Sequence, residues 1–204
     1  MYHQAVSDVT AFILAGGRSS RMGQDKAFLE LAGRTLLDRA LDLAASVAPE
    51  VRVVGDQTKF LHVGRTIEDV FPGRGPLGGI HAALTKSQTE LNLVIAVDLP
   101  FLEPRFLSYL LSQASQTTTL ATVPRTGDGW QPLCAVYRQD FAPVAEQSLR
   151  KKRNKIDALF KLVETREIGD VELRRMGFAD RMFRNLNTPE DLQAAERALA
   201  ENPR

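Results

Sequence analysis

Short apolar segments alternate along this chain with segments in which apolar residues recur every three or four positions. The first kind predicts β-strands, and the second predicts amphipathic helices. Their alternation indicates a mostly parallel sheet with helices on both faces, joined by right-handed crossovers. The predicted strands are Val9–Leu14, Val51–Val54, Leu93–Val97, Thr119–Val123 and Leu133–Tyr137, and the predicted helices are Leu36–Val47, Gly79–Lys86 and Pro104–Ser112.

Length and composition limit the class of protein. The 204 residues, 44% of them apolar, suffice for one domain with a sizeable core, and no linker or repeat divides them. With 26 basic and 25 acidic residues the net charge is +1, so no overall field favours nucleic acid or a membrane surface. No apolar run approaches the ~20 residues that span a bilayer, and no export signal opens the chain, so we expect a cytoplasmic protein. One cysteine, Cys134, excludes an internal disulfide and is expected to pack within a strand.

A turn rich in glycine and cations follows the first predicted strand. Residues 16–26 contain three glycines, two serines, two arginines and a terminal lysine, Lys26. Glycines let several backbone amides approach one anion, and the cations add charge opposite triphosphate oxygens. An ordinary polar loop has a similar composition, but Lys26 at the end favours phosphate binding. The spacing fits neither a Walker loop nor the dinucleotide fingerprint.

A carboxylate follows another predicted strand at the same edge of the sheet. Asp98 ends the run Val94-Ile95-Ala96-Val97-Asp98 and precedes Leu99-Pro100. The carboxyl ends of parallel strands share one edge, so Asp98 is expected beside the first loop. A carboxylate beside a triphosphate is a usual Mg²⁺ ligand, with waters completing the octahedron. The alternative is an aspartate that caps the following turn.

A second glycine cluster, residues 73–79, precedes a predicted helix. Its glycines allow the backbone to approach a flat ring, although an ordinary strand-to-helix loop has the same composition. Just upstream, Asp69 follows a short strand candidate, Arg65-Thr66-Ile67. A carboxylate can accept hydrogen bonds from two adjacent N–H donors of a heterocyclic ring together. His81 can touch the nucleotide from the following helix, but a surface role in the helix's first turn is preferred.

These motifs resemble those of nucleotidyltransferases of the molybdenum cofactor guanylyltransferase family. Every fixed position of that family's opening motif, Leu-Ala-Gly-Gly-x-Ser-x-Arg-Met-Gly-x-Asp-Lys, matches between Leu14 and Lys26. Asp98-Leu99-Pro100 is similar to the family's metal-carrying Asp-x-Pro. The remaining matches are Gly75-Pro76-Leu77-Gly78-Gly79, Gln131-Pro132-Leu133 and Asn185-Leu186-Asn187-Thr188-Pro189.

The resemblance implies a single-domain, Rossmann-like three-layer α/β sandwich of the nucleotide-diphospho-sugar transferase type. It divides residues 1–204 into a nucleotide half, roughly 8–113, and an acceptor half, roughly 114–200. Gly55 stands where many members have a nucleotide-contacting asparagine, and its backbone is expected to substitute. By resemblance, Lys26, Arg21 and Asp98 are catalytic, with Asp98 holding Mg²⁺; the nucleotide contacts are Leu14, Ala15, Gly16, Gly17, Arg18, Lys26, Gly55, Asp69, Pro76, Leu77, Gly78 and Asp98; and the acceptor contacts are Gln131, Asn185 and Asn187.

The implied reaction joins GTP to the terminal phosphate of molybdopterin, giving the guanine dinucleotide cofactor and pyrophosphate. Cofactor-insertion proteins or apo-molybdoenzymes are candidate partners. Two alternatives stay open: a related cytidylyl or sugar-1-phosphate transferase, and a non-catalytic chaperone that binds the cofactor. The basic run Arg150–Lys155 is expected to be a solvated helix end, or else to attract an anionic acceptor or partner. Asn187 or Thr188 is expected to cap the last helix.

Overall fold

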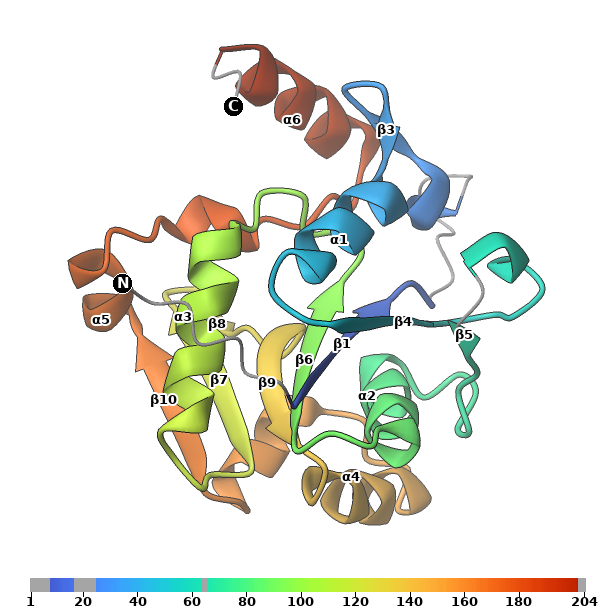
Figure 1. Cartoon of the computed structure of the whole chain (residues 1–204), viewed down its shortest axis with the longest axis vertical. Helices are drawn as coiled ribbons and strands as arrows, with labels where there is room; N and C mark the ends of the chain where they lie inside the picture. The colour runs from blue at the N-terminus through green and yellow to red at the C-terminus, as the bar shows by residue number, and fades with distance from the viewer. Residues whose placement is uncertain (1–7, 17–24, 64–65, 202–204) are drawn as a thin grey trace.

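The computed structural model describes residues 8–16, 25–63 and 66–201. Within them, eight strands form one sheet, and two short strands, β2 (Glu30–Leu31) and β3 (Arg34–Thr35), form a separate ribbon (Figure 1). The strands of the main sheet are β1 (Val9–Leu14), β4 (Glu50–Val54), β5 (Thr66–Ile67), β6 (Leu91–Ala96), β7 (Ala121–Thr126), β8 (Gly129–Trp130), β9 (Cys134–Arg138) and β10 (Thr165–Gly169).

The main sheet is mostly parallel, as the alternating segments predict. Its order is β10-β7-β9-β6-β1-β4-β5, with β8 attached to β7. The pairs β1/β4, β1/β6, β4/β5 and β7/β10 are parallel. Strand β9 runs antiparallel to both of its neighbours, β6 and β7. The amino end of β9 therefore meets the carboxyl ends of the other strands.

The helices connect these strands, and short 3-10 turns lie between them. None of the helices in the described part of the chain combines the length and the apolar character needed to cross a membrane. The helices are α1 (Leu36–Ala45), α2 (Pro76–Lys86), α3 (Pro104–Ser115), α4 (Phe141–Arg150), α5 (Asp170–Arg175) and α6 (Pro189–Glu201), and the turns are η1 (Lys26–Phe28), η2 (Leu61–Val63), η3 (Ile156–Lys161) and η4 (Asp180–Phe183).

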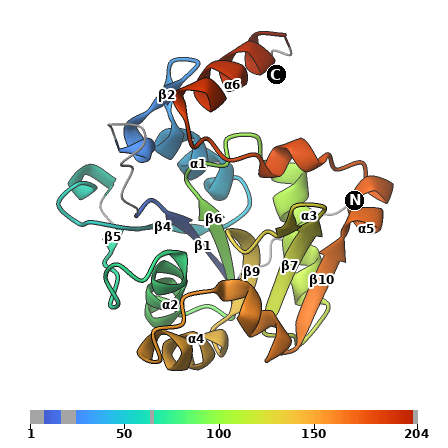
Figure 2. The same cartoon turned by 180° about the vertical axis from the view of Figure 1, so that it is seen from behind.

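Helices cover both faces of the sheet and make three layers. Because successive strand residues point to opposite faces, β1 contributes to two apolar clusters. Ala11 and Ile13 pack with residues of α1 and α3, whereas Phe12 and Leu14 pack with residues of α2 and α4. Figures 1 and 2 show α1 and α2 on opposite sides of the central strands. The expected three-layer α/β sandwich is confirmed.

Helix α2 begins at Pro76, three residues before the predicted start at Gly79. Proline fits the first turn of a helix, and the N-cap residue Gly75 adopts φ 68°, which glycine tolerates. The segment Pro76-Leu77-Gly78 therefore belongs to a helix and not to a glycine loop. The expectation that His81 lies on the surface is wrong, because its position in this longer helix leaves it 5% exposed. Cys134 is buried in β9, as predicted.

Candidate active site

Backbone hydrogen bonds continue the sheet beyond the carboxyl ends of β1 and β4. The amide of Ala15 donates to the carbonyl oxygen of Val54 at 3.0 Å, and the amide of Gly55 donates to that of Ile67 at 2.9 Å. These two N–H groups are therefore used inside the protein. A backbone contact with nucleotide at Ala15 or Gly55 has to come from other atoms than the amide hydrogen.

Lys26 lies at the centre of a small polar cluster. It begins η1, whose N-cap residue Asp25 accepts a hydrogen bond from the amide of Ala27 at 3.2 Å. From there the Lys26 Nζ atom donates to Asp98 Oδ2 at 2.7 Å and to Asn187 Oδ1 at 2.7 Å. The side chains of Lys26 and Asp98 are 20% and 15% exposed, so the pair is accessible from solvent. Residues from three separate motifs thus meet at one ammonium group.

Asp98 reaches this cluster from the turn after β6. The amide of Val97 donates to the carbonyl oxygen of Leu14 at 3.1 Å, which holds the turn against the first loop. The Asp98 carbonyl oxygen accepts from the amide of Leu186 at 3.0 Å, which brings the chain before α6 alongside. In the described residues the Asp98 carboxylate pairs with Lys26, and no turn amide donates to it. The turn-capping alternative therefore has no support from this geometry.

The two asparagines expected to face the acceptor flank a buried residue. Leu186 is fully buried, Asn185 is half-buried and Asn187 is exposed. Such alternation turns the two asparagines away from the core, as an extended segment requires. The Asn187 side chain uses its oxygen to accept from Lys26, which the sequence motifs alone did not predict.

Thr188, rather than Asn187, caps helix α6. Its Oγ1 atom accepts from the amide of Asp191 at 3.2 Å. In return, Asp191 Oδ2 accepts from the amides of Asn187 and Thr188, each at 3.0 Å. These hydrogen bonds, that from the Asn187 amide first, lower the pKa of Asp191. The Asn187 side chain is consequently left for the polar cluster.

Because Thr188 caps the helix and the Asn187 side chain does not, substitutions at these two positions should affect stability differently. Replacing Thr188 with alanine removes the helix cap and is expected to destabilise the protein by about 1 kcal/mol. Asn187→Ala keeps the backbone amide that Asp191 accepts from, so its loss of stability is expected to be smaller. Urea unfolding of both variants measures the difference. Equal destabilisation would show that the Asn187 side chain supports the helix start after all.

Gln131 lies at the same edge of the sheet, before β9. The amide of Ala96 donates to the carbonyl oxygen of Leu133 at 2.8 Å, which joins this segment to the end of β6. The Gln131 Nε2 atom donates to Thr126 Oγ1 at 3.1 Å and to the Gly129 carbonyl at 3.4 Å. Its amino group is therefore directed to the β7–β8 hairpin. No hydrogen bond in the described residues joins Gln131 to Lys26 or Asp98.

Asp69 is held against the first turn of α2. Its Oδ1 atom accepts from the amide of Phe71 at 2.8 Å. A Cβ placed on Gly78 would lie 2.5 Å from Asp69 Oδ2, so only glycine allows the carboxylate to lie there. Burial raises the pKa of Asp69, opposed by the Phe71 amide and by His81. The carboxylate also lies where the positive end of the helix dipole stabilises an anion.

The other predicted contacts in α2 are not equally available. Leu77 is fully buried in the core, so its side chain cannot contact a ligand, whereas Pro76 is exposed. Gly16 is exposed at the end of β1, and a Cβ on it would lie 3.7 Å from Gly55 Cα. Gly17, Arg18 and Arg21 lie outside the described residues.

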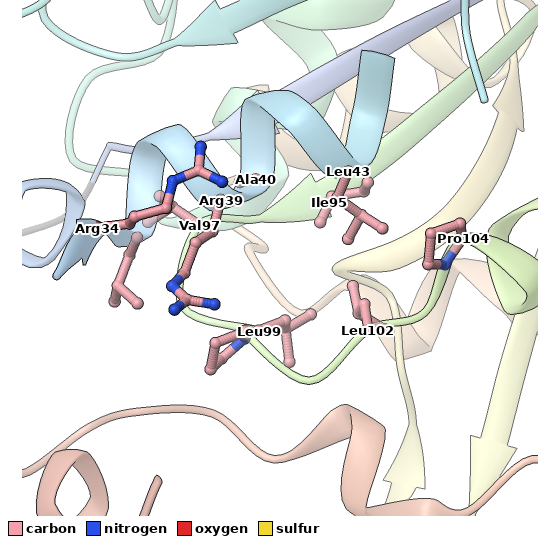
Figure 3. Close-up of a pocket in the computed structure, with 11 residues that line it drawn as sticks. Arg34, Arg39, Ala40, Leu43, Ile95, Val97, Leu99, Leu102 and Pro104 are labelled. Atoms are coloured by element: carbon pink, nitrogen blue, oxygen red, sulfur yellow. The ribbon is translucent and has the colours of Figure 1, made fainter. Parts of the chain in front are cut away.

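A separate hollow of about 190 Å³ lies between α1 and the loop after β6 (Figure 3). None of the predicted site residues lines it. Arg34 pairs with Asp42, and Arg39 donates to the carbonyl oxygen of Leu31, so both guanidinium groups already have partners. Its walls are otherwise apolar: Leu36, Ala40, Leu43, Ile95, Val97, Leu99, Pro100, Leu102 and Pro104.

Comparisons with known proteins agree with this arrangement. A probable molybdenum cofactor guanylyltransferase from Pelotomaculum thermopropionicum is 39% identical, over 96% of this chain and 95% of its own length. A molybdenum cofactor guanylyltransferase from Desulfosudis oleivorans is 35% identical over 94% of this chain and 96% of its own length.

Solved structures share the fold. The crystal structure of molybdopterin-guanine dinucleotide biosynthesis protein A from Archaeoglobus fulgidus superposes with a TM-score of 0.82 at 27% identity, covering 94% of this chain and 99% of that chain. CMP:2-keto-3-deoxy-manno-octonic acid synthetase superposes with a TM-score of 0.74 at 14% identity, over 96% of this chain and 99% of that chain, which shows the fold alone. Residues 11–166 match the family described as the MobA-like NTP transferase domain. The chain therefore belongs to the MobA-like nucleotidyltransferase family.

Proposed function

We propose that this chain transfers the guanylyl group of GTP to the terminal phosphate of molybdopterin-bound molybdenum cofactor. The products are the guanine dinucleotide form of the cofactor and pyrophosphate. One observation carries the proposal: Lys26 Nζ lies 2.7 Å from both Asp98 Oδ2 and Asn187 Oδ1. The related guanylyltransferases, similar over nearly the whole chain, support the choice of substrates.

The chemistry needs positioning and charge neutralisation rather than a base. A phosphate monoester has a second pKa of about 6, so the acceptor is already anionic at neutral pH. One of its oxygens attacks the α-phosphorus of GTP, and the bond from that phosphorus to the bridging oxygen of the β-phosphate breaks. The electron pair leaves with pyrophosphate. Holding the two phosphates in line and balancing their charge supplies most of the rate.

Lys26 is proposed to provide positive charge opposite the phosphates. Its ammonium group has three donors, two of which are directed to Asp98 and Asn187. These two partners fix the end of a long, flexible side chain before substrate arrives, which reduces the entropy lost in the reaction. Arg18 and Arg21 are proposed to steady the triphosphate and the departing pyrophosphate. Gly16 and Gly17 are proposed to contact the nucleotide.

The residues present fit a magnesium ion held mainly by substrate. The described residues contain no group of three or more His, Cys, Asp or Glu side chains that could form a complete cage. Mg²⁺ usually keeps several waters and takes one or two carboxylates together with substrate phosphates. Asp98, with its accessible carboxylate at the sheet edge, supplies such a ligand. When bound there, Mg²⁺ neutralises phosphate charge.

The acceptor is proposed to bind on the β9 side of this cluster. Asn185, Asn187 and Gln131 lie at that edge, and amide groups can both donate to and accept from a pterin ring. Strands β7, β9 and β10 form this half of the sheet, and β1, β4, β5 and β6 form the half that carries the nucleotide motifs. A cofactor-insertion protein or an apo-molybdoenzyme is the proposed recipient of the product.

Pyrophosphate release tests the proposal directly. The protein is incubated with Mg²⁺, the molybdopterin acceptor and one of GTP, ATP, CTP or UTP. We expect release with GTP and incorporation of GMP into the cofactor, detected by mass spectrometry. Equal rates with GTP and CTP would overturn the guanylyl assignment and leave a nucleotidyltransferase of other specificity. Tight cofactor binding without release from any nucleotide would indicate a carrier instead.

Guanine selection is expected to depend on Asp69. A site whose acceptors pair with N1–H and the 2-amino group rejects bases without them, because each unpaired acceptor costs roughly 1–3 kcal/mol. GTP should therefore be preferred to ATP by at least about tenfold. Asp69→Asn keeps an oxygen for the Phe71 amide but presents an amino group to the base. It should therefore weaken the binding of GTP and not of ATP, and so reduce the preference for GTP over ATP. Competition kinetics measures this ratio.

The variant also separates recognition from a purely structural role. If Asp69 only secures the start of α2, Asp69→Asn is expected to weaken GTP and ATP equally and to lower the thermal midpoint. That outcome would remove Asp69 from the base site.

A further inference from the structure

Residues 56–63, between β4 and β5, lie against the turn that carries Lys26. We call residues 56–63 the cover segment; Figure 1 shows it projecting beyond the sheet edge near η1. Within it, Lys59 Nζ pairs with Asp25 Oδ2 at 2.8 Å. The other oxygen of Asp25 accepts from the amide of Ala27 and so begins η1. One carboxylate thus links the cover segment to the helical turn of Lys26.

An apolar contact anchors the same segment independently. The ring of Phe60 is 1% exposed. A Cβ placed on Gly55 would lie 2.7 Å from Phe60 Cε2, so the ring fills the space that a side chain at position 55 would need. Phe60 also contacts the ring of Phe28, at the end of η1, with centroids 5.6 Å apart.

The cover segment has internal hydrogen bonds that fix Lys59 in place. Asp56 Oδ1 accepts from the amide of Thr58 at 2.8 Å and from its hydroxyl at 2.6 Å. The amide of Lys59 donates to the Asp56 carbonyl at 3.2 Å. The hydrogen bond to Asp25 raises the pKa of Lys59, so the Lys59 ammonium group stays charged at neutral pH. Lys59 therefore approaches Asp25 from a turn of defined shape.

We propose that Lys59 is a positioning residue for the transfer reaction and acts on Lys26 through Asp25. Lys59 holds the Asp25 carboxylate in the direction that caps η1, and η1 sets the path along which Lys26 reaches Asp98 and Asn187. Without Lys59, Asp25 Oδ2 loses this cationic partner, and the carboxylate is held less firmly as the acceptor of the Ala27 amide at the start of η1. The inference rests on the proposed function only for its effect on catalysis; the effect on Lys26 is independent of it.

Two variants and one control test this role. Lys59→Gln removes the charge, and Lys59→Arg keeps it. As a control, Arg52→Gln breaks a partly exposed ion pair with Glu50 at the amino end of β4, away from the site. Exposed ion pairs contribute little free energy, so the expected effect is modest. Lys59→Gln is expected to lower kcat about three- to fivefold, with KM for GTP nearly unchanged. Lys59→Arg should recover most of that loss, and the kcat of Arg52→Gln should match that of the native protein.

A second measurement does not depend on turnover. The rate at which a limiting amine-acylating reagent labels Lys26, read by mass spectrometry, reports whether its amine stays paired. We expect Lys59→Gln to raise this rate relative to lysines elsewhere, and Lys59→Arg to restore it. Unchanged labelling of Lys26 in Lys59→Gln would overturn the positioning role, whatever the activity. An inactive native protein with increased Lys26 labelling in the variant would instead overturn the proposed function and leave the positioning role standing.

Discussion

Asp98→Asn is expected to nearly abolish guanylyl transfer while leaving the protein folded. Asparagine has the same size and still offers an oxygen to Lys26, but it lacks the charge that holds a divalent cation beside phosphates. Losing an electrostatic group that acts in the transition state typically reduces the rate by about 10²–10³-fold. Single-turnover kinetics with saturating GTP measures the loss, and thermal unfolding checks the fold.

The metal provides the control for this variant. A higher Mg²⁺ concentration, or Mn²⁺ in its place, is expected to restore part of the activity of Asp98→Asn. More free metal ion compensates for the weaker binding that remains after the charged ligand is lost. Asn187→Ala removes another hydrogen-bond partner of Lys26, and its activity should not respond to the metal in this way. An Asp98→Asn protein that is active but unfolds at a lower temperature would restore the turn-capping interpretation.

The sequence predicted the central strands well because they are buried on both faces. Segments such as Val9–Leu14 and Leu91–Ala96 are nearly continuous apolar runs, which parallel sheets covered by helices produce. Strand β10 (Thr165–Gly169) was missed for the opposite reason. It lies at the sheet edge and contains Arg166 and Glu167, so it carries no apolar run.

Helix α4 (Phe141–Arg150) was also missed, although its sequence carries a usable signal. Phe141, Ala145 and Leu149 are spaced by four and are all buried. The basic run Arg150–Lys155 was expected to be a solvated helix end. Arg150 is indeed the last residue of α4, and residues 151–155 continue from it as an exposed, non-helical segment.

The sequence predicted which residues lie at the site, but not all of the contacts between them. Strand ends indicated that Lys26 and Asp98 share one edge, and the structure places them 2.7 Å apart. The meeting of Lys26 with Asn187 was not predictable, because 161 residues separate them and no regular strand carries Asn187. Within the described residues, a backbone hydrogen bond from the Leu186 amide to the Asp98 carbonyl joins that segment to the turn after β6.

The sequence also did not predict which backbone amides are available to a ligand. A glycine-rich sequence shows that amides can approach an anion, but not which of them already bond within the sheet. Ala15 donates to Val54, so it does not serve as an amide donor to phosphate. The structure also fills the space in which a side chain at position 55 would lie with the ring of Phe60, a contact that the glycine alone did not predict.

Lys26→Ala is expected to lower kcat by about 10²–10³-fold, which corresponds to roughly 3–4 kcal/mol of lost transition-state stabilisation. In the proposed mechanism the Lys26 ammonium group meets charge that develops on the departing pyrophosphate, so its loss should affect kcat more than KM for GTP. Stability should change little, because the Lys26 side chain is 20% exposed and an ion pair near the surface contributes modestly. Rapid-quench measurement of pyrophosphate release separates the chemical step from product release.

Two further variants serve as comparisons for Lys26→Ala. Lys26→Arg keeps the charge but not the compact three-donor geometry, so an intermediate rate is expected. Lys161→Ala removes an exposed lysine of η3 and should leave the rate unchanged. In Lys26→Ala, Asp98 loses the cation that it pairs with. The affinity of this variant for Mn²⁺ in the absence of nucleotide should therefore differ from that of the native protein. A native rate for Lys26→Ala at saturating GTP would remove Lys26 from the mechanism and leave its contacts with Asp98 and Asn187 as structural ones.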